Sequence, residues 1–203
     1  MGRVFVDTNV LFPFSVMDLM LALTEDGVHE LMWSEALLAE WELVIVREQR
    51  RPAASAAAVT AAIREFFPEC EVPPSAYASL VADMPGRDPD DRVHMAAAIA
   101  GRADVIVTWN LADFPAEALA ARGVQVSTPD AYLCWLLRSW PEEVAAVVVR
   151  LAGEKRRPRL TSLDLVEFLS KAGVTEFAER LRPLVGHAVT GGPGESRKHE
   201  GPQ

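Results

Sequence analysis

The chain has 203 residues, 50% of them hydrophobic and 24% charged, which is enough for one ordinary domain plus a small appendage and excludes wholesale disorder. Its formal net charge of −9 argues against a protein that coats nucleic acids. The charge does not exclude a local site for phosphates, because bound cations would offset acids clustered in one place and basic patches elsewhere could still contact phosphates. The two cysteines, Cys70 and Cys134, have the spacing of neither a disulfide framework nor a metal site, so we expect a reducing, cytoplasmic location.

The first half of the chain alternates short apolar runs with amphipathic stretches. Runs of β-branched and large apolar residues predict buried strands, and apolar residues at three- and four-residue spacing predict helices. Ser34, directly before one such stretch, is a suitable helix N-cap. In chain order we expect a strand at 4–6, a helix from 15 that stops at Gly27, a strand at 31–33, a helix after Ser34, a helix at 55–67, a short strand at 70–72 and a helix at 75–84.

The alternation continues to residue 128 and then ends. We expect a helix at 91–100, a central strand at 103–108, a short helix at 115–121 and a last strand at 124–126. Strands that alternate with helices indicate a parallel sheet covered on both faces. Beyond this point only helices are predicted, at 130–138, 141–151, 161–171 and 175–181.

These elements divide the chain into three parts. We expect an α/β domain over residues 1–128 and a small all-α module over residues 129–185, which is too small to be comfortably stable alone. Residues 186–203, rich in Gly, Pro and charge, are predicted to be a disordered tail. The apolar run at 4–6 is too short for a secretory signal and no later stretch could cross a bilayer, so no membrane association is expected.

Carboxylates stand beside the ends of several predicted elements. Asp7 follows the first strand, Glu40 lies on the second helix, Asp91 begins the helix before the central strand, and Asp113 follows that strand. Ligands of a parallel sheet gather at the carboxyl ends of its strands, so these acids can converge. Converging carboxylates repel one another unless a hard cation holds them together. The pattern therefore indicates a metal site with oxygen ligands, which is typical of phosphate chemistry.

Taken singly, each acid also has an ordinary structural explanation. Asp7 fits an Asx turn, Glu40 a solvated helix face, and Asp113 a loop. Asp91 fits a helix N-cap, but the three aspartates of Asp88-Pro89-Asp90-Asp91 exceed the need of one cap. The signal therefore lies in the combination of the segments.

Four segments carry that combination: Val6-Asp7-Thr8-Asn9-Val10-Leu11, Leu38-Ala39-Glu40, Asp88-Pro89-Asp90-Asp91, and Ile106-Val107-Thr108-Trp109-Asn110-Leu111-Ala112-Asp113-Phe114. In this order and spacing they resemble the PIN-domain ribonucleases, in particular the VapC-like toxins of bacterial toxin–antitoxin pairs. The resemblance covers about residues 3–128, and the helical addition at 129–183 is similar to one in a subset of these toxins. It implies a PIN-like α/β fold and an endoribonuclease that uses Mg²⁺ or Mn²⁺. It also implies RNA as the substrate and an antitoxin protein as a partner. The helical module can serve partner binding, formation of a homodimer or RNA positioning, and the sequence does not choose among them.

Position by position, the resemblance places the family's first aspartate on Asp7 and its helix-borne glutamate on Glu40. The third acid falls on Asp91, because the step from Asp91 to the alanines of its helix fits best, with Asp88 and Asp90 as rivals. Asp7 and Asp91 would then bind the metal ion, and Glu40 would complete the catalytic set.

The fourth acid departs from the family's pattern. Many relatives have an aspartate two residues after the strand-end threonine, where this chain has Asn110 after Thr108. Either Asp113 replaces that acid in the catalytic set, or Asn110 serves as a neutral ligand or water anchor. Supporting hydrogen bonds around the ligands are expected from Thr8, Asn9, Thr108 and Asn110.

Other side chains have two interpretations each. The arginines Arg47, Arg50 and Arg51 are candidate RNA contacts or a solvated helix end, and the same holds for the basic run at 155–159. Trp109, directly after the central strand, is a candidate for stacking on a base, although a tryptophan is more often part of a core. His94 we interpret as a satisfied interior or surface histidine rather than a catalytic group.

Two other classes of protein share part of this pattern. A phosphorelay receiver would need an acid pair before the first helix and a lysine after the last strand, and the sequence has neither. A non-catalytic protein of the same fold, which binds RNA or protein, is a stronger rival. The presence of the other expected acids argues against such a non-catalytic binding module, whereas Asn110 in place of the fourth acid is compatible with it.

Overall fold

A computed structural model describes residues 2–156 and 158–187 of the chain. Within these residues four parallel strands form a sheet of order β2–β1–β3–β4. The strands are β1 (Gly2–Val6), β2 (His29–Met32), β3 (Val105–Val107) and β4 (Gln125–Ser127). Val4 of β1 pairs with Leu31 on one side and Val105 on the other. The predicted parallel α/β sheet is confirmed.

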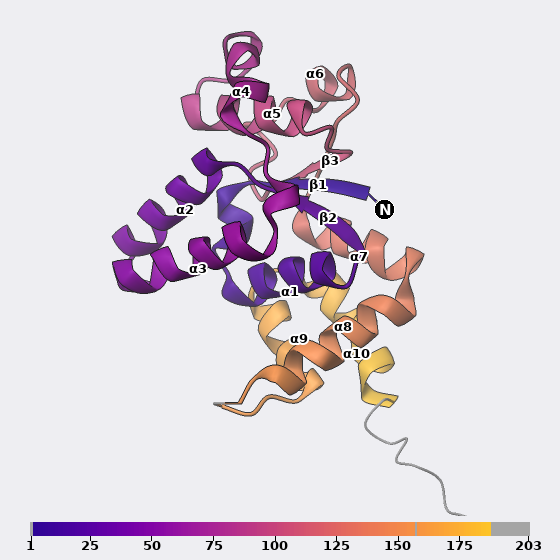
Figure 1. Cartoon of the computed structure of the whole chain (residues 1–203). Coiled ribbons are helices and arrows are strands. Elements are labelled where there is room, and N and C mark those ends of the chain that lie inside the picture. Colours follow the sequence, from indigo (N-terminus) through magenta and orange to yellow (C-terminus); the bar gives the residue numbers. More distant parts are fainter. Residues whose placement is uncertain (1, 157, 188–203) are drawn as a thin grey trace, which may run out of the picture.

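Helices cover both faces of the sheet, which explains why its two central strands are apolar over 4–6 and 105–107. On one face lie α1 (Phe14–Glu25) and α7 (Pro129–Ser139), and on the other lie α5 (Pro89–Ala100) and α6 (Ala116–Ala120) (Figure 1). Ala96, Ala97 and Ala98 of α5 are fully buried, and their small side chains let the helix approach the sheet closely. This approach sets the position of the first turn of α5, which carries the acidic run.

Two further helices form a layer beside the sheet. The second predicted helix is α2 (Glu35–Arg47), and Ser34 caps it as expected, since its hydroxyl accepts a hydrogen bond from the Leu37 N–H at 3.2 Å. Trp41 of α2 is buried and donates its indole N–H to the Leu11 carbonyl oxygen at 3.1 Å. The next helix, α3 (Ala53–Phe66), packs on α2.

The predictions for residues 70–72 and 75–84 differ from the structure. Residues 70–72 do not form a strand of the sheet, because Glu71 makes only an isolated bridge to Trp33 after a short 3-10 helix, η2 (Pro68–Cys70). The following Pro73-Pro74 has no backbone N–H with which to extend that pairing. The expected single helix is instead one turn, α4 (Pro74–Tyr77), and a 3-10 helix, η3 (Ala78–Asp83). The guanidinium of Arg92 binds the carbonyl oxygens of Val81 and Ala82, which takes the place of regular α-helical bonds there.

The predicted C-terminal helices are present as α7, α8 (Pro141–Glu154), α9 (Ser162–Lys171) and α10 (Thr175–His187), and α1 packs against α8 and α9. Thr161 and Asp164 form the capping box of α9, and Gly173 ends the α9–α10 turn with φ +101°. The last helix runs to His187, beyond its expected end at 181, and the rest of the predicted tail lies outside the described residues. In the described part of the chain, no helix is long and apolar enough to cross a membrane.

A buried histidine joins the sheet to the helical module. His29 of β2 lies 2.8 Å through Nε2 from the Met20 carbonyl oxygen and 2.9 Å through Nδ1 from the Tyr132 hydroxyl of α7. A carbonyl oxygen can only accept, so Nε2 carries the hydrogen and Nδ1 accepts from Tyr132. Burial lowers the pKa of His29 to about 4, against the opposing effect of the Met20 hydrogen bond, and His29 is therefore neutral.

We predict that His29 makes the protein less stable in mild acid. Its pKa is about 6.5 in an unfolded chain and about 4 in the folded one, so the unfolded state binds the proton first as the pH falls. Between about pH 7.5 and about pH 5 this linkage should remove about 2 kcal/mol of unfolding free energy. Urea unfolding of wild type and His29→Gln at both pH values measures it, and the variant should show a smaller pH dependence.

A matched control is Tyr132→Phe, which removes the hydroxyl but keeps the titrating ring. It should lower stability by about 1–3 kcal/mol, because Nδ1 of His29 loses its donor, and it should retain pH dependence between the two conditions. An equal pH dependence of wild type and His29→Gln would show that His29 is not the group responsible.

Candidate metal centre at the carboxyl edge of the sheet

The topology creates a crevice between β1 and β3. The chain leaves β1 through α1 to reach β2 on one side, whereas β3 lies on the other side of β1. Ligands of open parallel sheets bind at such a switch point, beyond the carboxyl ends of the strands. Asp7 follows β1 and Thr108 follows β3, so both side chains stand at this point.

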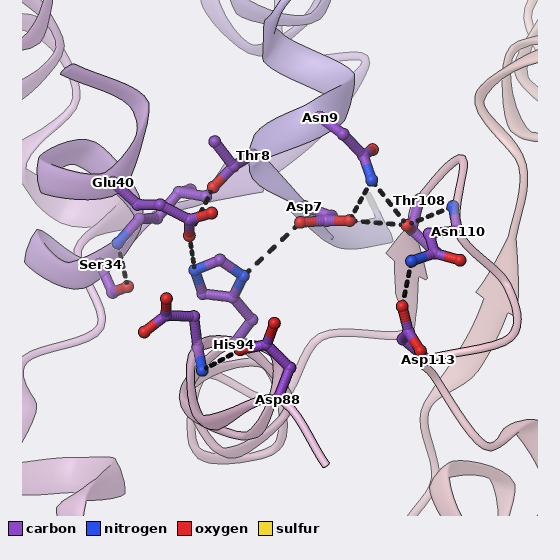
Figure 2. Close-up of polar contacts among 12 residues, drawn as sticks. Asp7, Thr8, Asn9, Ser34, Glu40, Asp88, His94, Thr108, Asn110 and Asp113 are labelled. Atoms are coloured by element: carbon purple, nitrogen blue, oxygen red, sulfur yellow. Dashed lines mark hydrogen bonds and ion pairs between the residues drawn. The ribbon is translucent and has the colours of Figure 1, made fainter. Parts of the chain in front are cut away.

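Asp7 is buried, with 6% of its surface exposed, and one of its oxygens is held by two donors. Oδ2 accepts hydrogen bonds from the Thr108 hydroxyl at 2.7 Å and from the side-chain amide of Asn9 (Figure 2). The other oxygen, Oδ1, faces the ring of His94, with Nδ1 3.7 Å away. Two of the predicted supporting residues thus orient Asp7 and leave Oδ1 open to a ligand.

Glu40 reaches the same place from α2. Its Oε2 accepts a hydrogen bond from the Thr8 hydroxyl at 2.9 Å and lies 3.1 Å from Nε2 of His94. Thr8 belongs to the 3-10 helix η1 (Thr8–Leu11), which starts directly after Asp7. Asp7 and Glu40, the predicted first and second acids, are therefore linked, because Thr8 follows Asp7 directly and holds Glu40.

The acidic run at the start of α5 separates into three roles. The N-cap of α5 is Asp88, not Asp91, since the Asp88 carboxylate accepts the Asp90 N–H at 2.9 Å. Asp90 is exposed and does not line the pocket, whereas Asp91 in the first helical turn does. The structure brings Asp91 to Asp7, while Asp88 lies at the rim of the same pocket.

The surroundings of Asp91 disfavour its charge. Burial is the main cause, and repulsion by Asp7, Asp88 and Asp113 adds to it, so the pKa of Asp91 rises to about 6. His94 opposes this shift with the opposite charge. A site that raises the pKa of its own carboxylate in this way is suited to a cation.

His94 is part of the acid cluster, which the sequence interpretation did not anticipate. It is buried between Glu40 and Asp7 (Figure 2). Burial lowers its pKa, but the contacts of its ring with Asp7 and Glu40, and the charges of both acids, outweigh burial and raise it to about 9. Nδ1 has no hydrogen-bond partner in the described residues, because Asp7 is too distant. The spacing of three between Asp91 and His94 was the available signal, since such residues share a helix face.

Asn110 and Asp113, the two candidates for the expected fourth acid, lie next to each other. Asn110 donates its backbone N–H to the Thr108 hydroxyl at 2.9 Å and its side-chain amide to Asp113. Both Asn110 and Asp113 line the pocket. Asn110 therefore holds the carboxylate of Asp113 at the pocket, and both stay candidates for the fourth position.

The pocket formed by these residues has a volume of about 420 Å³ and opens to solvent. One ligand atom each of Asp7, Asp91 and His94 lies within 4.8 Å of the other two. Apolar walls complete the pocket, from Phe12, Pro13, Val44 and Trp109. The carboxylate oxygens of Asp7 and Asp91 fit a divalent cation, because a hard ion would relieve the repulsion around Asp91. Nδ1 of His94 can join them as a ligand only once it has lost its proton.

The three candidate RNA-contact arginines differ in their surroundings. The Arg50 guanidinium lies 5.3 Å above the ring of Phe12, which lines the pocket, and Arg51 lies 4.0 Å above the ring of Phe14. Arg47 forms an ion pair with its neighbour Glu48 at 3.3 Å. Of these three arginines, Arg50 is therefore the one that lies against the wall of the pocket.

A second acidic hollow, of about 490 Å³, lies between α1, α3 and α8. Three of its four acids have partners: Asp18 pairs with Lys155, and Glu25 and Glu154 pair with Arg150, which leaves Glu69. These ion pairs neutralise the charge that would otherwise attract a cation. The pocket at the carboxyl edge of the sheet is therefore the better candidate for a metal site.

Comparison with known families agrees with this architecture. Residues 3–112 match the PIN domain family, and residues 129–183 match the family described as the VapC50 C-terminal domain. Since the first match covers more than half of the chain, the protein belongs to the PIN domain family, with a VapC50-type C-terminal extension.

Among curated proteins, the chain is similar to the "Putative ribonuclease VapC50" of Mycobacterium tuberculosis. The two are 34% identical over 108 residues, which is 53% of this chain. The matched part spans 63% of the length of that relative. No solved structure matches the chain.

We predict that Asp91→Asn makes the metal-free protein more stable. The pKa of Asp91 is about 6 in the folded chain and near 4 in an unfolded one, so wild-type stability falls as the pH rises through this window and stays lowered above it. Asparagine lacks the charge and should gain about 1 kcal/mol at neutral pH, a value reduced for solvent screening. Thermal unfolding in EDTA measures the gain.

The same unfolding experiment, with Mn²⁺ or Mg²⁺ in place of EDTA, tests whether Asp91 binds the metal ion. The ion should stabilise wild type by binding to the folded state, and it should stabilise Asp91→Asn much less. Asp90→Asn is the matched control: this exposed neighbour should change neither the metal-free stability nor the response to metal. A metal response in Asp91→Asn equal to that of wild type would contradict the assignment.

Proposed function

We propose that this protein is a metal-dependent endoribonuclease that hydrolyses RNA phosphodiester bonds, and that it is the toxin of a bacterial toxin–antitoxin pair. The observation that carries the proposal is the convergence of Asp7, Glu40, Asp91 and Asp113 from four separate parts of the chain on one pocket. Membership of the PIN domain family supports it, as does the name of the similar VapC50 protein, which describes a ribonuclease.

In this proposal Asp7 and Asp91 bind a Mg²⁺ or Mn²⁺ ion. When bound, such an ion activates a water molecule and offsets negative charge on the phosphate. Thr108 and Asn9 hold Oδ2 of Asp7, so that Oδ1 is presented to the ion in a defined orientation. Asp113, held by Asn110, and Glu40 complete the acidic set and orient the water and the scissile phosphate.

His94 acts as a positioning residue in the same proposal. The Glu40 carboxylate can only accept, so Nε2 of His94 carries the hydrogen between them. Thr8 donates to the same oxygen of Glu40, which fixes this carboxylate from two directions. Nδ1 faces Asp7 and is either a further ligand or a protonated counter-charge to the acids.

The remaining parts of the proposal concern partners and organisation. Arg50, associated with the pocket wall, would attract the RNA backbone, with Arg47 and Arg51 as weaker contacts. An antitoxin protein would inhibit the enzyme by covering the acidic pocket, in a cytoplasmic complex that can also contain a second copy of this chain. The nuclease part would comprise residues 1–128 and the helical module residues 129–185.

The alternative is a protein of the same fold that binds RNA or protein without cleaving it. The observation in its favour is the amide of Asn110 at a position where the family resemblance leads one to expect an acid. The carboxylate of Asp113 in the same pocket favours the enzyme instead. Metal-dependent cleavage of RNA distinguishes the two.

We predict that purified protein cleaves a fluorogenic single-stranded RNA in Mg²⁺ or Mn²⁺ and that Asp7→Asn lowers kcat/KM at least roughly 100-fold. Asparagine keeps the shape of Asp7 but removes the charge that the cation requires. Asp90→Asn serves as the control, because this acid is exposed and does not line the pocket. EDTA should abolish cleavage.

Two results would contradict the proposal. Cleavage by Asp7→Asn at the wild-type rate would exclude the proposed catalytic role of Asp7. Absence of cleavage by wild type in both metals, with RNA still bound, would favour the binding module.

A further inference from the structure

We propose that Trp109 stacks on an unpaired nucleobase of the substrate, and that Gly173 of the helical module holds the indole in place for this contact. The inference rests on the proposed ribonuclease function and names the substrate that the pocket selects: single-stranded RNA with an accessible base beside the cleaved bond. It also gives the C-terminal module a role at the site.

The backbone of Trp109 is fixed relative to the acid cluster. Its N–H donates to Oδ1 of Asn9 at 3.2 Å, and the same Asn9 side chain donates to Asp7. The preceding residue, Thr108, donates to Asp7 as well. One set of hydrogen bonds therefore orients both the proposed metal ligand and the start of the segment that carries the indole.

The indole of Trp109 is available to a ligand. It lines the acidic pocket, and 37% of its surface is exposed. By contrast, Trp33 and Trp41 are buried and donate their indole N–H groups to the carbonyl oxygens of Phe67 and Leu11. Among residues 2–156 and 158–187, the Trp109 side chain has neither a hydrogen bond nor an aromatic neighbour, whereas Trp135 and Trp140 pack against each other. Nothing in the core requires a tryptophan at position 109.

The helical module supports the indole from one side. A Cβ atom added at Gly173 would lie 3.1 Å from Cη2 and 3.5 Å from Cζ2 of Trp109, so the edge of the six-membered ring rests on this glycine. Gly173 has φ +101° in the turn between α9 and α10. Only a residue without a side chain combines this backbone conformation with so close a contact. The end of α9 thus forms part of the wall that holds Trp109.

Stacking suits this pocket because its charge is unfavourable for RNA. The carboxylates around Asp91 repel phosphates until a cation is bound, whereas a neutral ring gains affinity from the face of any base. Arg50 supplies positive charge at Phe12 in the wall of the same pocket. A base on Trp109 and a phosphate near Arg50 would hold a single strand across the acids, and a base paired within a duplex could not reach the ring.

Steady-state cleavage of a fluorogenic single-stranded RNA tests the contact. Trp109→Leu should raise KM roughly 5- to 150-fold, the range expected for loss of one base–aromatic stack, while kcat stays within about twofold. Trp109→Phe should recover part of the loss. RNAs that carry a single abasic site at successive positions identify the base that Trp109 contacts. At one position the abasic site should raise the KM of wild type but not that of Trp109→Leu. A merely structural role of Trp109 would not produce this difference.

The support from the helical module is tested with paired glycine variants. Gly173→Ala should raise KM toward the value of Trp109→Leu, because the new methyl group displaces the indole. Gly123→Ala is the matched control: it also has positive φ, +83°, but nothing lies within 4 Å of its added Cβ. Equal KM values for the two alanine variants would refute the role of Gly173, and thermal unfolding checks that both are folded.

The outcomes separate this inference from the proposed function. If wild type cleaves RNA and Trp109→Leu has an unchanged KM, the stacking role is wrong and the ribonuclease proposal stands. If wild type does not cleave, titration with the same RNA still decides. Quenching of tryptophan fluorescence that Trp109→Phe abolishes would support stacking in a binding module, and quenching that persists in the variant, or no quenching, would refute it.

Discussion

Burying the carboxylate of Asp7 between the ends of β1 and β3 imposes the strictest requirement on this structure, because a buried carboxylate needs hydrogen-bond donors or a cation. Thr108 and Asn9 supply the donors for one oxygen, and Thr108 can do so only because β3 pairs in parallel with β1. Asn9 in turn holds the backbone of Trp109, and Thr108 that of Asn110. The loop after β3 is therefore organised around the charge of Asp7.

The same cluster shows why a functional site reduces stability. Asp91 is held near Asp7, Asp88 and Asp113, and burial, together with repulsion by these three acids, raises its pKa. His94, buried between Asp7 and Glu40, offsets part of the negative charge from within. A sequence selected only for stability would not gather these acids, so the repulsion itself indicates that a ligand belongs there.

Two of the contacts between the helical module and the α/β part bear on stability and on the site. Tyr132 of α7 donates to the buried His29 at the sheet, and Gly173 after α9 contacts Trp109 at the pocket. The first contact concerns stability, since it satisfies a neutral buried imidazole. The second concerns the site, since it limits where the indole can lie. Removal of the module would disturb both, so its deletion does not separate binding from folding.

The parallel α/β architecture was predictable from the sequence alone, because strand and helix periods are local properties of the chain. The sequence also indicated Asp7, Glu40, Asp91 and Asp113, because the order and spacing of the segments that carry them resemble those of the PIN-domain family. Only the tertiary structure decided that Asp88 caps α5, that Asp91 faces Asp7, and that His94 lies between Asp7 and Glu40. Those distinctions depend on which side of one helical turn meets the sheet. The contact between Gly173 and Trp109 was likewise inaccessible, since residues 64 positions apart are brought together only by packing.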